Sequence, residues 1–333
     1  MAKFAILCYH RIGTGGVPIF SELPLEVFEE QIRYVRKRYR VISLGQLTRE
    51  LQDPVAGTQS VAITFDDGYR DLYSQAFPIL RRYGVPATVY LPAECIESGE
   101  APWYDRVFVA VQAYPGAELL LDLDAPRSFE LSSRASRIAA ASEIMLYLRT
   151  VPDARRRAVC AELEARVSMP EQELADRMLT WDQIREMQAG GISFGSHTMS
   201  HAVVSRLPEA EAKRELVESK LMLEKKLQEP VGDFAFPFGR PADCGRAAFP
   251  LLAEAGYRSA VTTIEGVNAS GANPYSLRRT QIGENHHLAT FAFKLNELFI
   301  RAGEQNTADI WASSSLDVQR EASVRSSPFV SSR

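Results

Sequence analysis

Short apolar runs alternate along the first part of the chain with segments whose apolar residues recur at helical spacing. Residues 4–9, 61–65 and 85–91 have the length and composition of buried strands. Between them, residues 25–39 place Phe28, Ile32 and Val35 on one side of a predicted helix. Alternating strands and helices predict β–α units, and hence a parallel sheet that is either open or closed into a barrel.

Helix boundaries in this part of the chain are marked by the residues that usually form them. The helix predicted for residues 76–83 ends at Gly84, where a left-handed C-cap belongs. A short strand is expected at residues 41–44 and a helix at residues 46–51.

The same alternation returns after residue 180. Thr180 is a good N-cap for a helix over residues 181–188, and a strand follows at residues 192–194. The later predicted elements are a charged helix from Pro208 to about 227, a strand at 234–236, a helix at 247–255 closed by Gly256, a strand at 259–263 and a helix at 288–300. Because chemistry in α/β folds is found at the carboxyl ends of strands, polar residues just after a strand become the candidates.

Two regions break the pattern. Residues 96–178 are helix-rich with arginine-dense stretches such as 155–157, and we interpret them as an insertion into the α/β body. Residues 302–333 lack apolar periodicity and end in Ser-Ser-Pro-Phe-Val-Ser-Ser-Arg, which predicts a disordered C-terminal tail. The catalytic body is therefore expected to span residues 1–301.

Composition narrows the class of protein. With 46% hydrophobic and 24% charged residues, the chain is typical of a soluble globular protein. The net charge is −4 and no run of Lys and Arg suggests a surface that follows a phosphate backbone, so we expect no nucleic-acid partner. No apolar stretch approaches the roughly 20 residues of a transmembrane helix. The apolar start breaks at His10-Arg11 without a cleavage-type site, so we expect a first strand, no signal peptide and a cytoplasmic protein. The cysteines are too scattered for a zinc or disulfide framework: Cys8, Cys95, Cys160 and Cys244.

The first candidate for chemistry is the run Thr64-Phe65-Asp66-Asp67-Gly68 at the end of an apolar strand. Adjacent carboxylates repel, and burying both in ionised form is costly without a cation or hydrogen-bond donors. Gly68 lets the backbone turn sharply after them. Alone, the run also fits aspartates that merely cap the next helix.

The second candidate is the pair His197 and His201, directly after the strand at 192–194. Histidines four apart on one helical turn can converge on one ion, although in isolation they also fit a solvated polar turn. A parallel α/β body brings strand ends together, so an Asp and both His side chains are expected to meet. Two nitrogens and one oxygen leave an open position for water on Zn²⁺ or a similar ion, and the other Asp is free to act as a base. The combination predicts a hydrolytic metal site.

These residues resemble the motifs of the polysaccharide deacetylase (NodB-homology) family, carbohydrate esterase family 4. The first family motif is intact at Thr64–Gly68, and the second is present as His197 and His201 with three residues between them. The resemblance covers roughly residues 4–263 and implies a distorted (β/α) barrel. It also implies that Asp66 is the catalytic base and that Asp67, with the two histidines, binds one divalent metal ion.

The same resemblance implies an activity, which is removal of N-acetyl groups from an acetylated amino-sugar oligo- or polysaccharide. Zinc is the expected ion, with cobalt, nickel and manganese as alternatives, because a His₂Asp set suits several divalent metals.

The third family motif, Arg-x-Pro-Tyr, is altered. Ala235 stands in the arginine position, followed by Pro237 and Phe238. By resemblance these form one wall of the substrate groove, and the Phe238 backbone N–H stabilises the oxyanion; a core strand ending in a turn is the alternative. Some family members carry a Leu-x-Arg element in this part of the chain. By resemblance, Arg279 replaces the missing motif arginine as the cation that orients Asp66; a surface arginine is the alternative.

The family motif that supplies the general acid, Leu-x-Leu-x-His, is absent. His286 and His287 fall in that part of the chain and are either acid candidates or a solvated helix start. His10 follows the first strand and is expected either to line the pocket or to serve as a hydrogen-bonded structural residue. Trp103-Tyr104-Asp105 predicts a sugar-stacking platform or, alternatively, the small core of the insertion.

Three other functions would each fit part of the sequence. A hydrolase of non-sugar C–N bonds, such as cyclic imides, shares the metal triad and stays an alternative. A non-catalytic sugar-binding relative has no need of Asp66. An aspartyl phosphatase is disfavoured, because adjacent Asp66 and Asp67 point apart on an extended backbone. The missing export signal favours a glycan made inside the cell, or a short or lipid-linked oligosaccharide at an exopolysaccharide assembly site; the glycan and the oligomeric state stay open.

Overall fold

The computed structural model describes residues 2–13, 22–53, 57–175 and 177–301. Nine strands in this part of the chain form one curled sheet, in the order β11-β10-β9-β6-β5-β1-β12, with β4 beside β5 and β13 beside β1. The strands are β1 (Lys3–Tyr9), β4 (Arg40–Val41), β5 (Gln59–Phe65), β6 (Ala87–Leu91), β9 (Ile192–Ser196), β10 (Asp233–Ala235), β11 (Ser259–Val261), β12 (Val267–Ala269) and β13 (Thr280–Gln281). All neighbours run parallel except β12, which is antiparallel to β1.

The two edges of the sheet are linked by residues 277–281. Leu277 donates to Ala260 and accepts from Thr262 at the β11 edge, with N···O distances of 2.9 and 2.8 Å. A few residues later, Thr280 and Gln281 pair with Leu7 and Cys8 of β1. The sheet therefore curls toward closure, and the predicted distorted barrel is confirmed.

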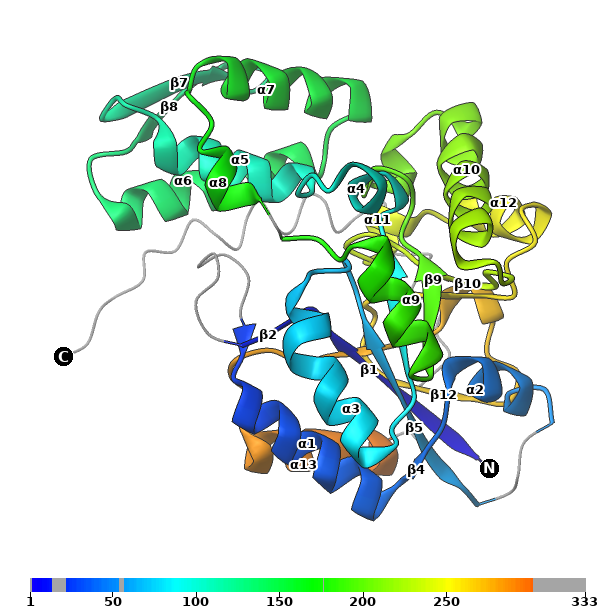
Figure 1. Cartoon of the computed structure of the whole chain (residues 1–333). Helices are drawn as coiled ribbons and strands as arrows, with labels where there is room; N and C mark the ends of the chain where they lie inside the picture. Colours follow the sequence, from blue (N-terminus) through cyan, green and yellow to red (C-terminus); the bar gives the residue numbers. More distant parts are fainter. Residues whose placement is uncertain (1, 14–21, 54–56, 176, 302–333) are drawn as a thin grey trace.

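Helices cover the outside of this sheet (Figure 1). They are α1 (Leu25–Arg38), α2 (Leu44–Glu50), α3 (Phe77–Tyr83), α9 (Trp181–Ala189), α10 (Glu209–Leu227), α11 (Pro241–Cys244), α12 (Ala248–Glu254) and α13 (Leu288–Arg301). The predicted face of α1 is buried. Thr180 caps α9 with reciprocal hydrogen bonds to Gln183, and Gly84 ends α3 at φ 61° and ψ 38°. These boundaries follow from local capping chemistry and confirm the predictions.

Two predicted elements have different limits in the structure. The strand expected at 41–44 is confined to Arg40–Val41, because Ser43 already accepts the Gln46 N–H and caps α2. A π-helical turn over Leu72–Ala76 precedes α3, so helical backbone begins before residue 76.

The region predicted to be an insertion forms a lobe on one side of the sheet (Figure 1). Its elements are α5 (Trp103–Ala113), β7 (Glu118–Asp122), β8 (Pro126–Glu130), α6 (Arg134–Leu148), α7 (Asp153–Ala165) and α8 (Glu171–Leu174), and the short helix α4 (Ala93–Ser98) before them lies beside α10. The hairpin β7–β8 was not predicted, since β8 buries only Phe129 and lacks apolar alternation. The buried apolar residues of the lobe are continuous with the core of the body.

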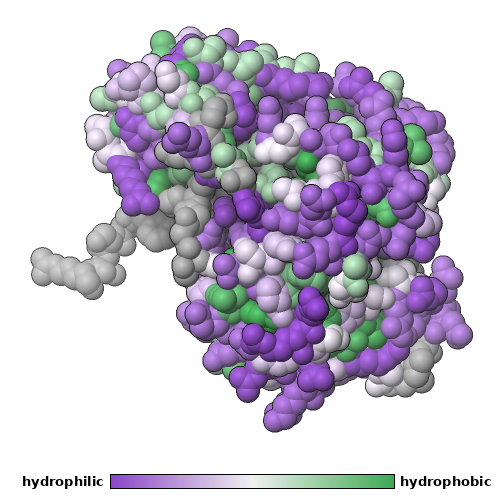
Figure 2. Space-filling model, viewed as in Figure 1, coloured by the Kyte–Doolittle hydropathy of each residue, from purple (hydrophilic) through white to green (hydrophobic). Residues whose placement is uncertain are grey.

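Length and hydropathy decide whether a helix in the described part of the chain could span a membrane. No helix there is both long and apolar enough to cross a membrane. The face seen in Figure 2 is mostly hydrophilic, with small separate hydrophobic areas. The tail predicted for residues 302–333 lies outside the described residues.

Candidate active site

Asp66 and Asp67 follow β5 at its carboxyl end and are both buried. Asp67 has a left-handed backbone with φ 73°, and Gly68 follows with φ 69°. A Cβ at Gly68 would lie 2.7 Å from the Leu91 side chain, so a glycine is required there. This turn directs the two carboxylates to different partners.

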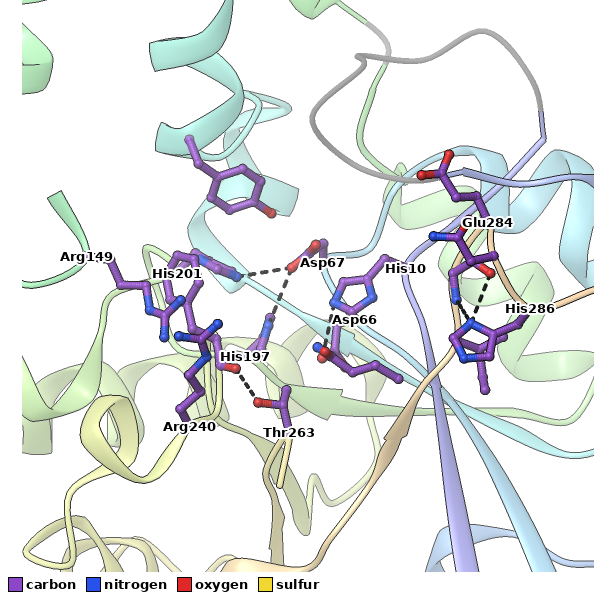
Figure 3. A pocket seen from close by; sticks show the side chains of 16 residues that line it. His10, Asp66, Asp67, Arg149, His197, His201, Arg240, Thr263, Glu284 and His286 are labelled. Atoms are coloured by element: carbon purple, nitrogen blue, oxygen red, sulfur yellow. Dashed lines mark hydrogen bonds and ion pairs between the residues drawn. The ribbon is translucent and has the colours of Figure 1, made fainter. Parts of the chain in front are cut away.

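Asp67 faces the two histidines that follow β9. Its Oδ1 lies 3.1 Å from His201 Nε2 and 3.5 Å from His197 Nε2, and all three side chains are buried (Figure 3). The three residues share a cluster in which candidate ligand atoms lie within 4.8 Å of one another. The expected helical turn between the histidines is wrong: Thr198 and His201 have left-handed backbones, with φ 65° and 56°, so an irregular loop brings the rings together.

The loop that carries the histidines is held from two sides. Glu215 of α10 is buried, and its carboxylate accepts hydrogen bonds from Met199 N, Ser200 N and Ser200 Oγ at 2.7, 3.1 and 2.9 Å. From the insertion, the Trp103 ring N–H donates to the His201 carbonyl at 3.2 Å. Charge-assisted bonds to a buried carboxylate restrict a loop that has no regular hydrogen bonding of its own.

The hydrogen bonding of His197 indicates that this site fits a metal ion. Its Nδ1 lies 2.7 Å from the Ala235 carbonyl oxygen, which can only accept, so a neutral ring carries its proton on Nδ1. The Nε2 lone pair then faces Asp67 Oδ1, and a cation between them relieves this contact. Metal–ligand bonds of about 2.0–2.2 Å in a tetrahedron separate the ligand atoms by roughly 3.3–3.6 Å, close to the observed spacing. Burial also lowers the pKa of His201 despite the opposing effect of Asp67, which favours the neutral, ligating form.

Asp66 faces Arg279, which is fully buried. The guanidinium donates to both carboxylate oxygens at 2.6 and 2.7 Å and, through Nε, to the Thr262 carbonyl at 2.8 Å. Burial would raise the pKa of Asp66, but Arg279 and His197 outweigh it, so the pKa lies below its usual value. Asp66 is therefore held as a carboxylate.

Cys8 and His10 also approach Asp66, and the three could be mistaken for a second metal-binding group. Burial raises the pKa of the Cys8 thiol well above its usual value, so the thiol stays protonated. Asp66 is already neutralised by Arg279. The group therefore offers a metal ion only a protonated thiol, a carboxylate whose two oxygens already accept from Arg279, and His10, which is a poorer ligand set than Asp67, His197 and His201.

The turn after β10, which the resemblance places in the wall of the substrate groove, contributes Phe238 to the cavity described below. Phe238 has φ 61°, its ring lies 5.2 Å from the His201 ring, and its carbonyl accepts from Thr263 Oγ1 at 2.6 Å. The Phe238 N–H makes no hydrogen bond with any described residue. Pro237 is buried and shapes this turn by accepting from the Gly239 N–H at 2.7 Å, and it does not line the cavity described next.

A cavity of about 450 Å³ opens over these groups. Within the described part of the chain its lining residues are His10, Asp66, Asp67, Tyr104, Arg149, His197, His201, Phe238, Arg240, Thr263, Gln281, Ile282, Gly283, Glu284, Asn285 and His286. Figure 3 shows His10 beside Asp66, with Arg149 and Arg240 on the far side of the His–Asp cluster. The cavity therefore brings together the two sequence motifs, the altered third motif and residues that carried no motif.

The three remaining histidine candidates differ in position. His10 Nε2 lies 3.9 Å from Asp66 Oδ2, and its side chain is 32% exposed, so it reaches both the base and the cavity. His286 lines the cavity, but its Nδ1 accepts from the Gly283 N–H at 3.1 Å and its Nε2 lies 3.3 Å from Lys294 Nζ. His287 does not line the cavity.

Trp103 and Tyr104 are buried and lie next to the metal-ligand loop. The Tyr104 ring is 4.8 Å from His201, and the Trp103 ring is 5.9 Å from Phe238. Only Tyr104 of the two lines the cavity. Both side chains belong to the buried core that the insertion shares with the body, and they also pack against the site, which the sequence did not predict.

Sequence reasoning missed Glu215, Arg149, Arg240 and Glu284. Glu215 is one of many charged residues on α10, and only its burial sets it apart. Arg149 ends α6 and resembles any surface arginine in the sequence. No local signal identifies these residues.

The chain is similar to known proteins in sequence and in fold. A family model described as polysaccharide deacetylase matches residues 54–260, more than half of the chain. The Bacillus subtilis (strain 168) protein YxkH is 22% identical over 283 residues, which are 84% of this chain and 72% of YxkH. Among solved structures, the deacetylase PplD of Streptococcus pyogenes in complex with acetate has a TM-score of 0.60 at 21% identity, with 88% of this chain and 98% of PplD covered. IcaB from Ammonifex degensii has a TM-score of 0.58 at 17% identity, with 88% and 97% covered.

Proposed function

Because the chain belongs to the polysaccharide deacetylase family, whose members hydrolyse N-acetyl amide bonds of polysaccharides, we propose that it deacetylates an N-acetylated amino-sugar oligo- or polysaccharide with one divalent metal ion. One observation carries the proposal: a carboxylate held ionised by Arg279 lies beside the convergent Asp67, His197 and His201 in a single cavity. A base next to an open metal site is the arrangement that amide hydrolysis by water needs.

Each residue of the first two motifs has a distinct part in this proposal. Asp67, His197 and His201 would hold the ion, which when bound would acidify a water molecule and polarise the acetyl carbonyl. Asp66 takes a proton from the water molecule while the water oxygen attacks the carbonyl carbon of the acetyl group. Arg279 keeps Asp66 ionised and oriented, because it engages both carboxylate oxygens.

The wall residue Phe238 supports the developing negative charge. Its N–H makes no hydrogen bond with a described residue, and its ring lies against His201. A backbone donor that is left without a partner beside the reacting centre is suited to an oxyanion. Pro237 and Thr263 keep the turn in its left-handed conformation.

The leaving amine needs a proton when the C–N bond breaks, and we assign this role to His10. It is a third exposed, lines the cavity and lies on the opposite side of Asp66 from the histidine pair (Figure 3). His286 is already engaged by Gly283 and Lys294, which makes it the weaker candidate. The products are acetate and a free amino sugar.

The test is acetate release from a panel of N-acetylated oligosaccharides, before and after chelation and after return of Zn²⁺, Co²⁺, Ni²⁺ or Mn²⁺. Metal-dependent acetate release that Asp66→Asn abolishes supports the proposal. Hydrolysis of cyclic imides with no acetate release from any glycan would overturn the substrate class. Full activity in metal-free protein would overturn the mechanism.

A further inference from the structure

The cavity carries two arginine side chains that the proposed deacetylation chemistry does not use. Arg149 comes from the end of α6 in the insertion, and Arg240 follows the Phe238 turn. Both are attached to Asp243, a buried residue of α11: Arg149 through its side chain and Arg240 through its backbone N–H at 3.1 Å. Two elements far apart in the sequence therefore meet at one end of the cavity.

Arg149 is fixed in place. Its Nε and Nη2 donate to the two oxygens of Asp243 at 3.0 and 2.8 Å, and its guanidinium lies 5.1 Å from the centre of the Phe238 ring. Its side chain is only 16% exposed. Because Nε and Nη2 are engaged by Asp243, Nη1 is left as the donor that can serve a ligand in the cavity.

Charge is distributed unevenly along the cavity. The acidic residues that line it are Asp66, Asp67 and Glu284. Arg279 neutralises the first, and the histidine cluster engages the second. Figure 3 shows Glu284 at the opposite end from Arg149 and Arg240, with the metal-site residues between them. The end opposite Glu284 holds the guanidinium groups of Arg149, whose counter-ion is Asp243, and of Arg240. Their N–H donors suit an oxyanion, and the metal-site residues between the two ends limit how far that oxyanion can lie from the acetyl group.

We infer that the substrate carries an oxyanion, a phosphate or a carboxylate, close to its reacting N-acetyl group and that Arg149 and Arg240 bind it. This inference rests on the proposed function. Guanidinium groups bind such oxyanions through paired N–H donors, and a pre-oriented arginine loses little entropy on binding. Neutral N-acetylated chains would leave this end of the cavity without a matching group.

The experiment compares matched substrates. One pair is N-acetylglucosamine 1-phosphate and methyl N-acetylglucosaminide; the other is a disaccharide in which glucuronate or glucose neighbours N-acetylglucosamine. Acetate release by the metal-loaded protein should have a higher kcat/KM for the anionic member of at least one pair, mainly through KM. Which pair responds distinguishes phosphate from carboxylate.

Arg240→Gln and Arg149→Lys should lower the anionic-to-neutral ratio of kcat/KM by about tenfold or more, because a hydrogen bond to a charged group contributes at least that much. Arg82→Gln on α3, whose parent side chain is 63% exposed, is the matched control and should leave the ratio unchanged. A purely structural role for the arginines would lower both rates together and keep the ratio, and that result overturns the inference.

A second measurement does not depend on turnover. In chelated protein, the anionic sugar that is preferred should raise the Tm of the wild type and of Arg82→Gln but not of Arg240→Gln. Equal hydrolysis of neutral and anionic substrates would overturn only the anion site. Absence of acetate release from every glycan would overturn the proposed function itself.

Discussion

Asp66 and Arg279 are 213 positions apart in the sequence, yet the guanidinium donates to both oxygens of the carboxylate at 2.6 and 2.7 Å. Ala235 occupies the position where the third family motif has an arginine. Arg279 reaches the same carboxylate from the segment that links β11 to β1. The positive charge that Ala235 cannot provide at the end of β10 is thus provided by Arg279.

Arg279→Gln should lower kcat by about 10²-fold or more, because Asp66 would lose its counter-ion and its orientation as a base. Leaving one buried partner uncompensated also costs about 3–5 kcal/mol of stability. Activity assays and urea unfolding would measure the two effects. Arg278→Gln, at the neighbouring half-exposed position, is the control and should retain both activity and stability. Wild-type turnover in Arg279→Gln would show that Asp66 does not depend on this pair.

Metal content should separate the two aspartates. The purified protein is expected to bind about one divalent ion per chain, and Asp67→Asn or His201→Ala should lose it because each removes one of the three ligands that the described residues offer at this site. Asp66→Asn should keep the metal and lose most turnover. Elemental analysis alongside acetate release tests this division, and equal metal loss in the Asp66 and Asp67 variants would contradict it.

Glu215→Gln should weaken metal binding by roughly 10–100-fold, since outer-shell partners of metal ligands usually have effects of that size. The amide can accept fewer hydrogen bonds than the carboxylate, so the loop that carries His197 and His201 would be held less firmly. Competition with a metal-binding dye gives the affinity. Glu218→Gln, an exposed change on the same helix, is the control. Unchanged affinity in Glu215→Gln would assign this residue to folding alone.

His10→Gln should slow hydrolysis of the N-acetyl sugar by about 10²-fold or more, because a general acid contributes 10²–10⁴-fold. Hydrolysis of 4-nitrophenyl acetate should be much less affected, since nitrophenolate leaves without a proton. Comparison of the two substrates separates proton donation from a general disturbance of the site. His287→Gln, outside the cavity, should match the wild type on both, whereas an equal loss on both substrates in His10→Gln would argue against the acid role.

Most strands and helices of the barrel could be predicted from the sequence, because their apolar patterns and capping residues act over a few neighbouring positions. Thr180 at the start of α9 and Gly84 at the end of α3 act through hydrogen bonds and backbone angles within a few residues. The strands β12 and β13 were missed, as was the β7–β8 hairpin. β12 and β13 span only three and two residues, too few for a periodic pattern, and β8, the partner of β7, buries only Phe129.

For the site, the sequence by itself predicted that Asp66, Asp67, His197 and His201 lie close together, because each motif directly follows a strand of a parallel sheet, and the structure places all four in one cavity. Only the tertiary structure decided which partners surround them. Pairing of residues 277–281 with both sheet edges puts Arg279 against Asp66, α10 puts Glu215 under the histidine loop, and the insertion puts Arg149 beside Phe238. These contacts depend on how distant elements pack against one another, and the residues next to each of them in the sequence do not indicate that packing.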